Sequence, residues 1–281
     1  MIAILSLVPI FYSRLSSHSG NARKQLRELF ESGVFEAAYL QSRELLQASP
    51  LDTFLLTVHG FSAYQLAIAQ INTFDTVAYI NDSIWSIRKA LLSRENSSDG
   101  RLFYVLGKAY FHKGPEYADL AVYYLEKARD SSFRATDIPE YLGLSYAALG
   151  DYRSSVAAFS QALVAEPSDL LLFSIARSYE ALDEFEPAGA YLVRCLEVSR
   201  DSNTINAARL LLGSILLKTG DISGAEAEFL RVIEDSGDNA EAHYQLGELF
   251  ALQGDITRAR AEWRRAIRID PAHVPARSRL N

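Results

Sequence analysis

The chain has 281 residues, of which 49% are hydrophobic and 22% are charged, and its formal net charge is −7. This composition is ordinary for a soluble globular protein, and the acidic balance argues against a nucleic-acid-binding surface spread over the whole chain. The single cysteine, Cys195, excludes an intrachain disulfide framework.

Residues 1–18 form a leader whose first twelve residues are strongly apolar. Twelve residues are too few to span a bilayer, which needs about 20 apolar residues, and the leader lacks the cleavage site of a secretory signal. Three interpretations stay open: the end of a longer anchor if translation begins upstream, a segment that contacts a membrane surface, or a segment that packs on the rest of the chain. An anchor followed by basic residues favours a cytoplasmic body, and the compartment is otherwise open. The basic residues are Arg14, Arg23, Lys24 and Arg27.

Residues 19–52 and 53–99 are each expected to form an antiparallel pair of helices. In the second pair, 30 residues separate Gly60 from Ala90, whereas 19 residues separate the equivalent positions further along the chain. The sequence leaves two explanations open: either both helices are longer than usual, or an insertion at residues 70–75 bulges between them.

From residue 100 onward, a pattern of small residues returns at near-constant spacing. A Gly or Ala lies on one apolar helix, a break at Gly or Asp follows, and a second amphipathic helix carries another small residue. The first small residues are successively 36, 33, 37 and 34 residues apart. A fixed period of this kind indicates stacked helix pairs. The first small residues are Gly107, Gly143, Ala176, Gly213 and Gly247, and their partners in the last four pairs are Ala162, Cys195, Val232 and Ala266.

The residue types at the repeating positions have physical reasons. A small residue in the first helix lets the second helix approach closely, and an aromatic residue such as Trp263 fills the space between neighbouring pairs. A glycine at the turn, such as Gly254, supplies the left-handed conformation that ends a helix, and Asp255 after it can cap the next helix. The same pattern predicts that Cys195 is a small buried residue at a helix contact rather than a nucleophile.

This pattern resembles the tetratricopeptide repeat, a helix-turn-helix unit of about 34 residues. The resemblance covers residues 19–273 and implies an all-α fold, a right-handed α-solenoid of about seven stacked helix pairs. Residues 274–281 are then a short tail with little sequence to cover the last apolar face, which favours self-association because solenoid ends need polar caps. The predicted units are 19–52, 53–99, 100–135, 136–168, 169–205, 206–239 and 240–273.

The resemblance also implies that the first helix of each unit lines a concave face that binds a partner. The second and third units concentrate aromatic and basic residues at the positions expected to lie there. Aromatic anchors with a cationic rim are typical of a peptide-binding hot spot, although a slight error in register would turn several of these residues into core. The predicted partner-binding residues are Phe54, Phe61, Tyr64, Arg101, Tyr104, Lys108, Phe111, His112, Phe173, Arg177 and Tyr244.

The C-terminal stretch, residues 255–281, carries seven arginines and three acidic residues. A solvated convex helix face is the default interpretation of such a stretch. Docking to an acidic partner or to a membrane surface is the alternative.

Enzyme chemistry has no support in the sequence. The five histidines are scattered without metal-ligand spacing, and the glycines are accounted for by turns and close packing rather than by a phosphate-binding loop. We therefore expect a non-enzymatic scaffold, without cofactor or metal, that binds a protein or peptide partner and no nucleic acid. Two alternatives stay open: a carrier or sensor of an apolar ligand in the aromatic groove, and a self-associating assembly subunit. Membrane contact through residues 1–12 stays open as well.

Overall fold

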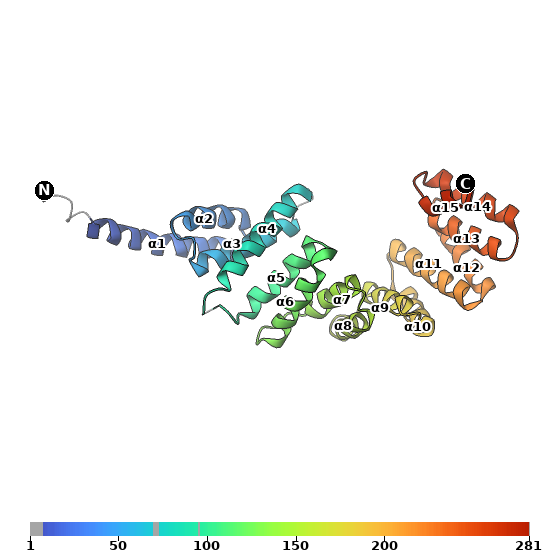
Figure 1. The fold of residues 1–281 in the computed structure, drawn as a ribbon, viewed down its shortest axis with the longest axis horizontal. Helices are drawn as coiled ribbons and strands as arrows, with labels where there is room; N and C mark the ends of the chain where they lie inside the picture. Colours follow the sequence, from blue (N-terminus) through green and yellow to red (C-terminus); the bar gives the residue numbers. More distant parts are fainter. Residues whose placement is uncertain (1–7, 70–72, 95, 281) are drawn as a thin grey trace. The chain divides into compact units, whose positions relative to one another are not determined.

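The computed structural model describes the whole chain except residues 1–7, 70–72, 95 and 281, and it describes no side chains at residues 8–19 and 73. Fifteen α-helices and one 3-10 helix occupy the described part, which contains no strand (Figure 1). The all-α repeat fold predicted from the sequence is therefore confirmed. The leader side chains and residues 70–72, half of the predicted bulge at residues 70–75, lie outside the described residues. Among the described residues, no helix is both long and apolar enough to cross a membrane.

The chain divides into two compact units, residues 1–149 and residues 150–281. Within each unit, helices that follow one another along the chain pack as neighbours. The first unit contains α1 (Val8–Glu31), α2 (Phe35–Ala48), α3 (Thr53–Ala69), α4 (Thr73–Ala90), α5 (Gly100–Lys113), η1 (Pro115–Tyr117), α6 (Ala118–Asp130) and α7 (Ile138–Ala148). The second unit contains α8 (Tyr152–Ala165), α9 (Asp169–Ala181), α10 (Phe185–Val198), α11 (Ser202–Thr219), α12 (Ile222–Asp235), α13 (Ala240–Leu252), α14 (Ile256–Ile269) and α15 (Val274–Leu280).

The long second repeat consists of two extended helices. Helix α3 has 17 residues and α4 has 18, whereas α5 and α6 have 14 and 13. The two long helices pack closely at Gly60, where an added Cβ would lie only 2.7 Å from Cγ1 of Ile87. Of the two explanations for the wide spacing, the structure supports the longer helices.

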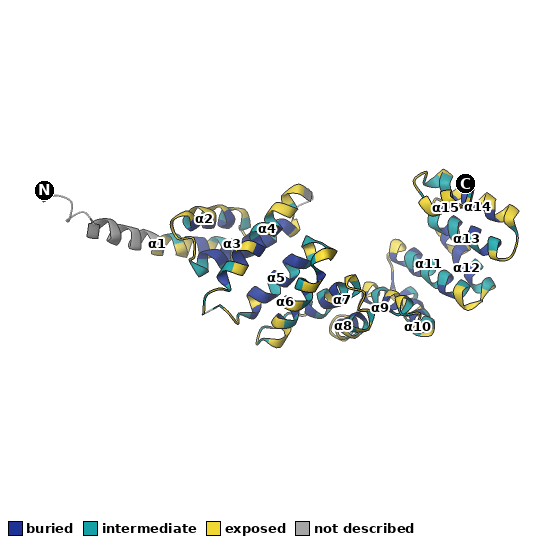
Figure 2. Cartoon of the chain, viewed as in Figure 1, coloured by how far each residue is buried: buried dark blue, intermediate teal, exposed yellow. Residues whose placement is uncertain are grey.

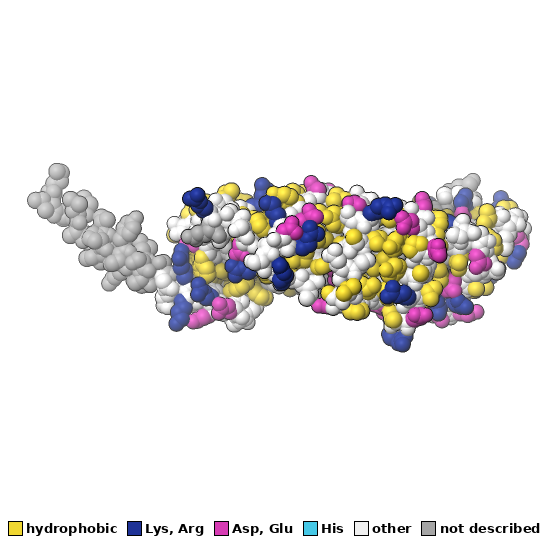
Figure 3. All heavy atoms as spheres, turned by 90° about the horizontal axis from the view of Figure 1, so that it is seen from below, with side chains coloured by type: hydrophobic (Ala, Val, Ile, Leu, Met, Phe, Trp, Pro, Cys, Tyr) yellow, Lys and Arg dark blue, Asp and Glu magenta, His cyan; other side chains and the backbone are white. Residues whose placement is uncertain are grey.

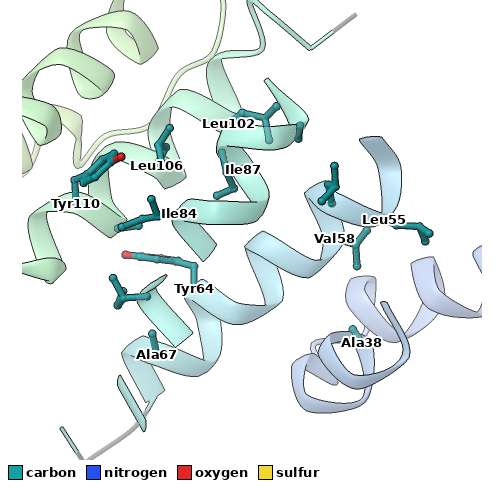
Figure 4. Close-up of a cluster of buried hydrophobic side chains, with 14 of the residues drawn as sticks. Ala38, Leu55, Val58, Tyr64, Ala67, Ile84, Ile87, Leu102, Leu106 and Tyr110 are labelled. Atoms are coloured by element: carbon teal, nitrogen blue, oxygen red, sulfur yellow. The ribbon is translucent and has the colours of Figure 1, made fainter. Parts of the chain in front are cut away.

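The core of the first unit lies between α3, α4 and α5. Figure 4 shows Tyr64 of α3 among apolar side chains that include Ile84 and Ala67, with Leu106 and Tyr110 of α5 on the far side of α4. Tyr64 is 3% exposed, and Ile87 and Leu106 are fully buried. The interior of this unit is therefore built from the apolar faces of two repeats: the second, which consists of α3 and α4, and the third, which begins with α5.

The small residues of the first helices make room for aromatic residues of the second helices. At Gly247 in α13, an added Cβ would lie 2.5 Å from Cδ1 of Trp263 in α14, which is 6% exposed. At the turn between these helices, Gly254 has a φ of +81°, and the Asp255 side chain accepts a 2.9 Å hydrogen bond from the backbone nitrogen of Arg258. Cys195 is fully buried, as its place in the repeat predicted.

Within the predicted tail, residues 274–280 form helix α15. Ala276 of α15 is fully buried and, with Leu280, packs on the cluster that contains Trp263. The guanidinium of Arg279 forms a bidentate ion pair with Glu248 of α13. Figure 2 shows α15 beside α13 and α14. Helix α15 therefore covers part of the apolar face that the sequence left without an evident cover.

Candidate functional site

A cavity of about 430 Å³ lies between α1, α3 and the start of α5 in the first unit. We call it the N-terminal groove. Three residues predicted to bind a partner line it together, Phe54, Phe61 and Arg101. The full lining consists of Arg27, Phe30, Glu31, Thr53, Phe54, Thr57, Val58, Phe61, Asn96, Asp99 and Arg101.

The apolar part of the N-terminal groove is aromatic. Phe54 and Phe61 come from α3, where seven residues place them two helical turns apart on one face. Phe30 of α1 packs beside Phe61, with 6.3 Å between the ring centroids. All three rings are half-buried, so they are fixed by the core and still offer area to a ligand. Rigid aromatic rings of this kind are the usual energetic centre of a binding surface.

The cations around the N-terminal groove differ in how they are neutralised. Arg101 donates to Asp99 at 2.7 Å, and this hydrogen bond holds the pKa of the Asp99 carboxyl below its usual value. Arg23 forms an ion pair with Asp52. The guanidinium of Arg27 lies 5.5 Å above the Phe54 ring, is exposed, and has no carboxylate partner among the described residues. Arg27 is therefore the cation that remains for a ligand.

Three more of the predicted residues, Tyr64, Tyr104 and Lys108, lie with Tyr141 in a second cluster, which we call the tyrosine cage. The Lys108 ammonium lies 4.4 Å from the Tyr141 ring centroid, 4.9 Å from that of Tyr104 and 5.9 Å from that of Tyr64. It donates to Asp137 at 2.8 Å and to the Tyr104 hydroxyl at 3.0 Å. Burial alone would lower the Lys108 pKa, but the hydrogen bonds to Asp137 and Tyr104 outweigh it and raise the pKa. Lys108 is thus a permanent cation already held by its own chain.

Phe111 and His112 flank the tyrosine cage through Tyr141. The Phe111 ring meets the Tyr141 ring edge-on at 5.1 Å, and the His112 ring lies 5.9 Å from it. Tyr64 departs from the expected concave exposure, because it is 3% exposed and belongs to the core. The register error considered for the aromatic stripe therefore applies to Tyr64, whereas Phe54 and Phe61 are half-buried against the core cluster.

The three predicted residues of the second unit do not gather into one site. Phe173 is half-buried against the core of α9 and α10, and Arg177 is exposed. Tyr244 is half-buried, with its ring 5.2 Å from the His273 ring. Two cavities of the second unit, of about 660 Å³ and 560 Å³, contain none of the three in their lining.

Several residues that shape the two clusters were missing from the predicted site. Arg27 and Phe30 bring α1 into the N-terminal groove, and Asp137 and Tyr141 bring α7 into the tyrosine cage. Arg27 and Asp137 occupy repeat positions equivalent to those of predicted residues, so the period itself was the signal that could have found them. Within the described part of the chain, no group of three His, Cys, Asp or Glu side chains is placed to hold a metal ion.

The tetratricopeptide repeat family model matches residues 142–194 and 210–274. No curated protein matches the chain. Among solved structures, the C-terminal part of a TPR repeat-containing protein from Cytophaga hutchinsonii is 16% identical, with a TM-score of 0.64 over 92% of this chain and 99% of that chain. A tetratricopeptide repeat protein from Parabacteroides merdae is 15% identical, with a TM-score of 0.55 over 93% of this chain and 96% of that chain.

A further similar structure is that of YrrB, described as a TPR protein with an unusual peptide-binding site. It is 23% identical, with a TM-score of 0.52 over 68% of this chain and 96% of that chain. At these identities, the three structures show the fold that this chain shares with them.

Proposed function

Since the chain is a tetratricopeptide repeat protein, we propose that it is a non-enzymatic scaffold whose first unit binds a segment of a partner protein in the N-terminal groove. The observation that carries the proposal is the combination of an aromatic floor with an unpaired cation. Phe54 and Phe61 offer half-buried rings, and Arg27 lies over Phe54 without a carboxylate of its own. The peptide-binding site described for YrrB is consistent with this use of the fold.

The size and chemistry of the N-terminal groove favour a peptide over an apolar small ligand. A cavity of about 430 Å³ lies within the range of ligand pockets, about 300–1,000 Å³. Its lining mixes three phenylalanines with Arg27, Glu31 and Asn96, which are polar groups at the rim of an open groove. A peptide supplies an apolar side chain for the floor and backbone or charged groups for the rim.

Selection from a library of random peptides displayed on phage tests this proposal. Peptides that bind the wild-type protein should lose affinity about 30-fold for a Phe54→Ala variant, because truncating an aromatic anchor costs about 2 kcal/mol or more. Arg27→Gln should weaken the acidic members of the selected set more than the neutral ones. Isothermal titration calorimetry measures each affinity.

The matched control is Tyr123→Ala, which removes an aromatic side chain that is 50% exposed on α6, away from the groove lining. Selected peptides should bind this variant as well as they bind the wild-type protein. The proposal fails if no peptide is selected, or if the selected peptides bind the Phe54→Ala and wild-type proteins equally. Circular dichroism of each variant separates loss of binding from loss of fold.

A further inference from the structure

The outward face of α14 is strongly basic on an otherwise acidic unit. Residues 150–254 carry 17 Asp or Glu and seven Lys or Arg, whereas residues 255–281 carry three Asp or Glu and seven Arg. Five of those arginines lie within α14 (Ile256–Ile269), and all five are exposed. They are Arg258, Arg260, Arg264, Arg265 and Arg268.

Three of these arginines form an evenly spaced row without counter-ions. Arg260, Arg264 and Arg268 are four residues apart, so they lie on one side of the helix with about 6 Å between neighbours. None of the three forms an ion pair or a side-chain hydrogen bond with another described residue. Arg258 and Arg265, in contrast, pair with Asp255 at 2.6 Å and with Glu262 at 2.6 Å.

No carboxylate on the helix itself neutralises this row. Glu262 is the one acidic residue of α14, and it is 7% exposed. Its two oxygens are occupied by His243 at 2.7 Å and by Arg265. The row of Arg260, Arg264 and Arg268 therefore presents three free guanidinium groups, which match carboxylates in a bidentate geometry.

We propose that this row binds an acidic helical segment of a partner protein, with carboxylates at positions i, i+4 and i+8. A partner helix with this spacing repeats its carboxylates about every 6 Å, the same interval as the arginines. The row spans about 12 Å, or eight residues of helix, so it accommodates a short segment. This surface belongs to the second unit and adds a binding site beyond the N-terminal groove.

The surroundings of the row disfavour long polyanions. A nucleic acid that extends beyond α14 meets the acidic remainder of the unit, and single strands also need exposed aromatic rings for stacking. No aromatic side chain among residues 150–280 is exposed. On the face drawn in Figure 3, acidic and basic side chains are interspersed instead of forming one broad basic field.

A membrane surface fits the row less well than a protein does. Helices that lie in a bilayer interface insert large apolar residues between their cations. In α14 the large apolar residue nearest the row faces the core: Trp263 is 6% exposed, and Ala259 and Ala266 are fully buried. Ile256, at the first turn of α14, is 47% exposed but precedes the row. The stretch that carries Arg260, Arg264 and Arg268 therefore offers charge without a large exposed apolar side chain, which suits a short acidic peptide.

Three synthetic helical peptides test the proposal: one with Glu at i, i+4 and i+8, one with Gln at these positions, and one with the three Glu spread around the helix. The full-length protein should bind the first peptide about tenfold more tightly than the other two, by fluorescence anisotropy at low salt. Raising the salt should weaken this binding, because exposed ion pairs are screened. The combined variant Arg260→Gln, Arg264→Gln and Arg268→Gln should lose the preference, since it lacks all three ion pairs.

The control is the combined variant Arg153→Gln, Arg194→Gln and Arg231→Gln, which removes the same charge from exposed positions on α8, α10 and α12. It should keep the preference. If circular dichroism shows that the α14 variant is unfolded, the single variant Arg264→Gln serves as the test. It should reduce the preference for the first peptide from about tenfold to about threefold or less.

Four results would each overturn the proposal. They are no binding of the first peptide, equal binding of the two Glu peptides, equal loss in the control variant, and a stronger row-dependent affinity for duplex DNA, for phosphatidylserine vesicles or for a second copy of the chain. None of these results bears on Phe54 or Arg27. Failure here is therefore distinguishable from failure of the proposed function.

Discussion

At the scale of single residues, burial determines the protonation of His59. Its ring stacks on Tyr39 with 4.5 Å between centroids, and its Nδ1 lies 2.9 Å from the Ser42 hydroxyl. Burial lowers the His59 pKa, and the attraction of the Asp82 carboxylate offsets only part of this effect. His59 is therefore neutral in the folded protein near pH 7.

The stability of the first unit should fall as the pH drops below about 6.5, the pKa of an unfolded histidine. Between the lowered folded pKa and 6.5, the unfolded chain binds the proton that the folded chain rejects, so acid favours unfolding. Urea unfolding between pH 5 and pH 7.5 measures this slope. A His59→Gln variant should show a shallower slope than the wild-type protein, and equal slopes would contradict the assignment to His59.

Phe229 contributes to stability through its packing against Gly213. The ring is fully buried, and an added Cβ at Gly213 would lie 2.5 Å from its Cε1. Phe229→Ala should lower the free energy of unfolding of the second unit by about 3–5 kcal/mol, because it removes a large side chain and leaves a cavity. Leu230→Ala, at a neighbouring position that is 41% exposed, should cost less than about 1 kcal/mol by urea unfolding. Comparable losses in the two variants would show that Phe229 is not a core residue.

At the scale of elements, α15 packs on the apolar face of the last helix pair. Besides Ala276 and Leu280, it is fixed by the ion pair of Arg279 with Glu248. His273 accepts the backbone N–H of Ala276 at 3.2 Å, and its other ring nitrogen lies 3.1 Å from Glu241. The helix is only seven residues long, so it depends on these contacts rather than on its own propensity.

Deletion of residues 274–281 should expose the apolar end of the second unit and make the protein self-associate. Static light scattering across a concentration series should show a mass above that of the monomer for the truncated chain. An Arg277→Ala variant in the intact chain is the control, because Arg277 is exposed and makes no ion pair with a described residue. If the truncated chain had the same mass as this control, α15 would not cover a surface through which the protein self-associates.

The period of the sequence was enough to predict helix pairs, the tight approach at Gly247 and the burial of Cys195. These features follow from residue size at fixed spacing, which is a local property. The burial of Tyr64 and the ion pairs of Arg101 and Lys108 were not predictable in the same way. Whether a ring turns into the core, and whether a cation finds a carboxylate, depends on neighbours from other helices. The cap at α15 was missed because seven residues carry too short a pattern to show a helical period.

At the scale of the whole molecule, the two units contain separate buried clusters. One cluster runs from Leu26 to Ala121 in the first unit, and two others lie in the second unit around Leu192 and Trp263. In repeat proteins each module contacts only its neighbours, so a local change in stability spreads over a limited distance. A single free energy of unfolding therefore describes this chain poorly.

Hydrogen exchange measured by mass spectrometry should resolve this separation. In the Phe229→Ala variant, amides of α11 to α14 should exchange faster, while those of α3 and α4 should keep the rates of the wild-type protein. Local opening is governed by the contacts of the segment that opens. Faster exchange throughout the chain would indicate that the units unfold as one.

Cys195 gives the second unit a built-in chemical reporter. It is the only thiol of the chain, it is fully buried, and burial raises its pKa to about 11. Its Sγ also donates weakly to the backbone oxygen of Asp169, 3.4 Å away. An alkylating reagent reacts with the thiolate, so it modifies Cys195 only when α9 and α10 separate. The rate at which Cys195 is alkylated in the wild-type protein therefore measures how often α9 and α10 separate, without any dye or engineered residue.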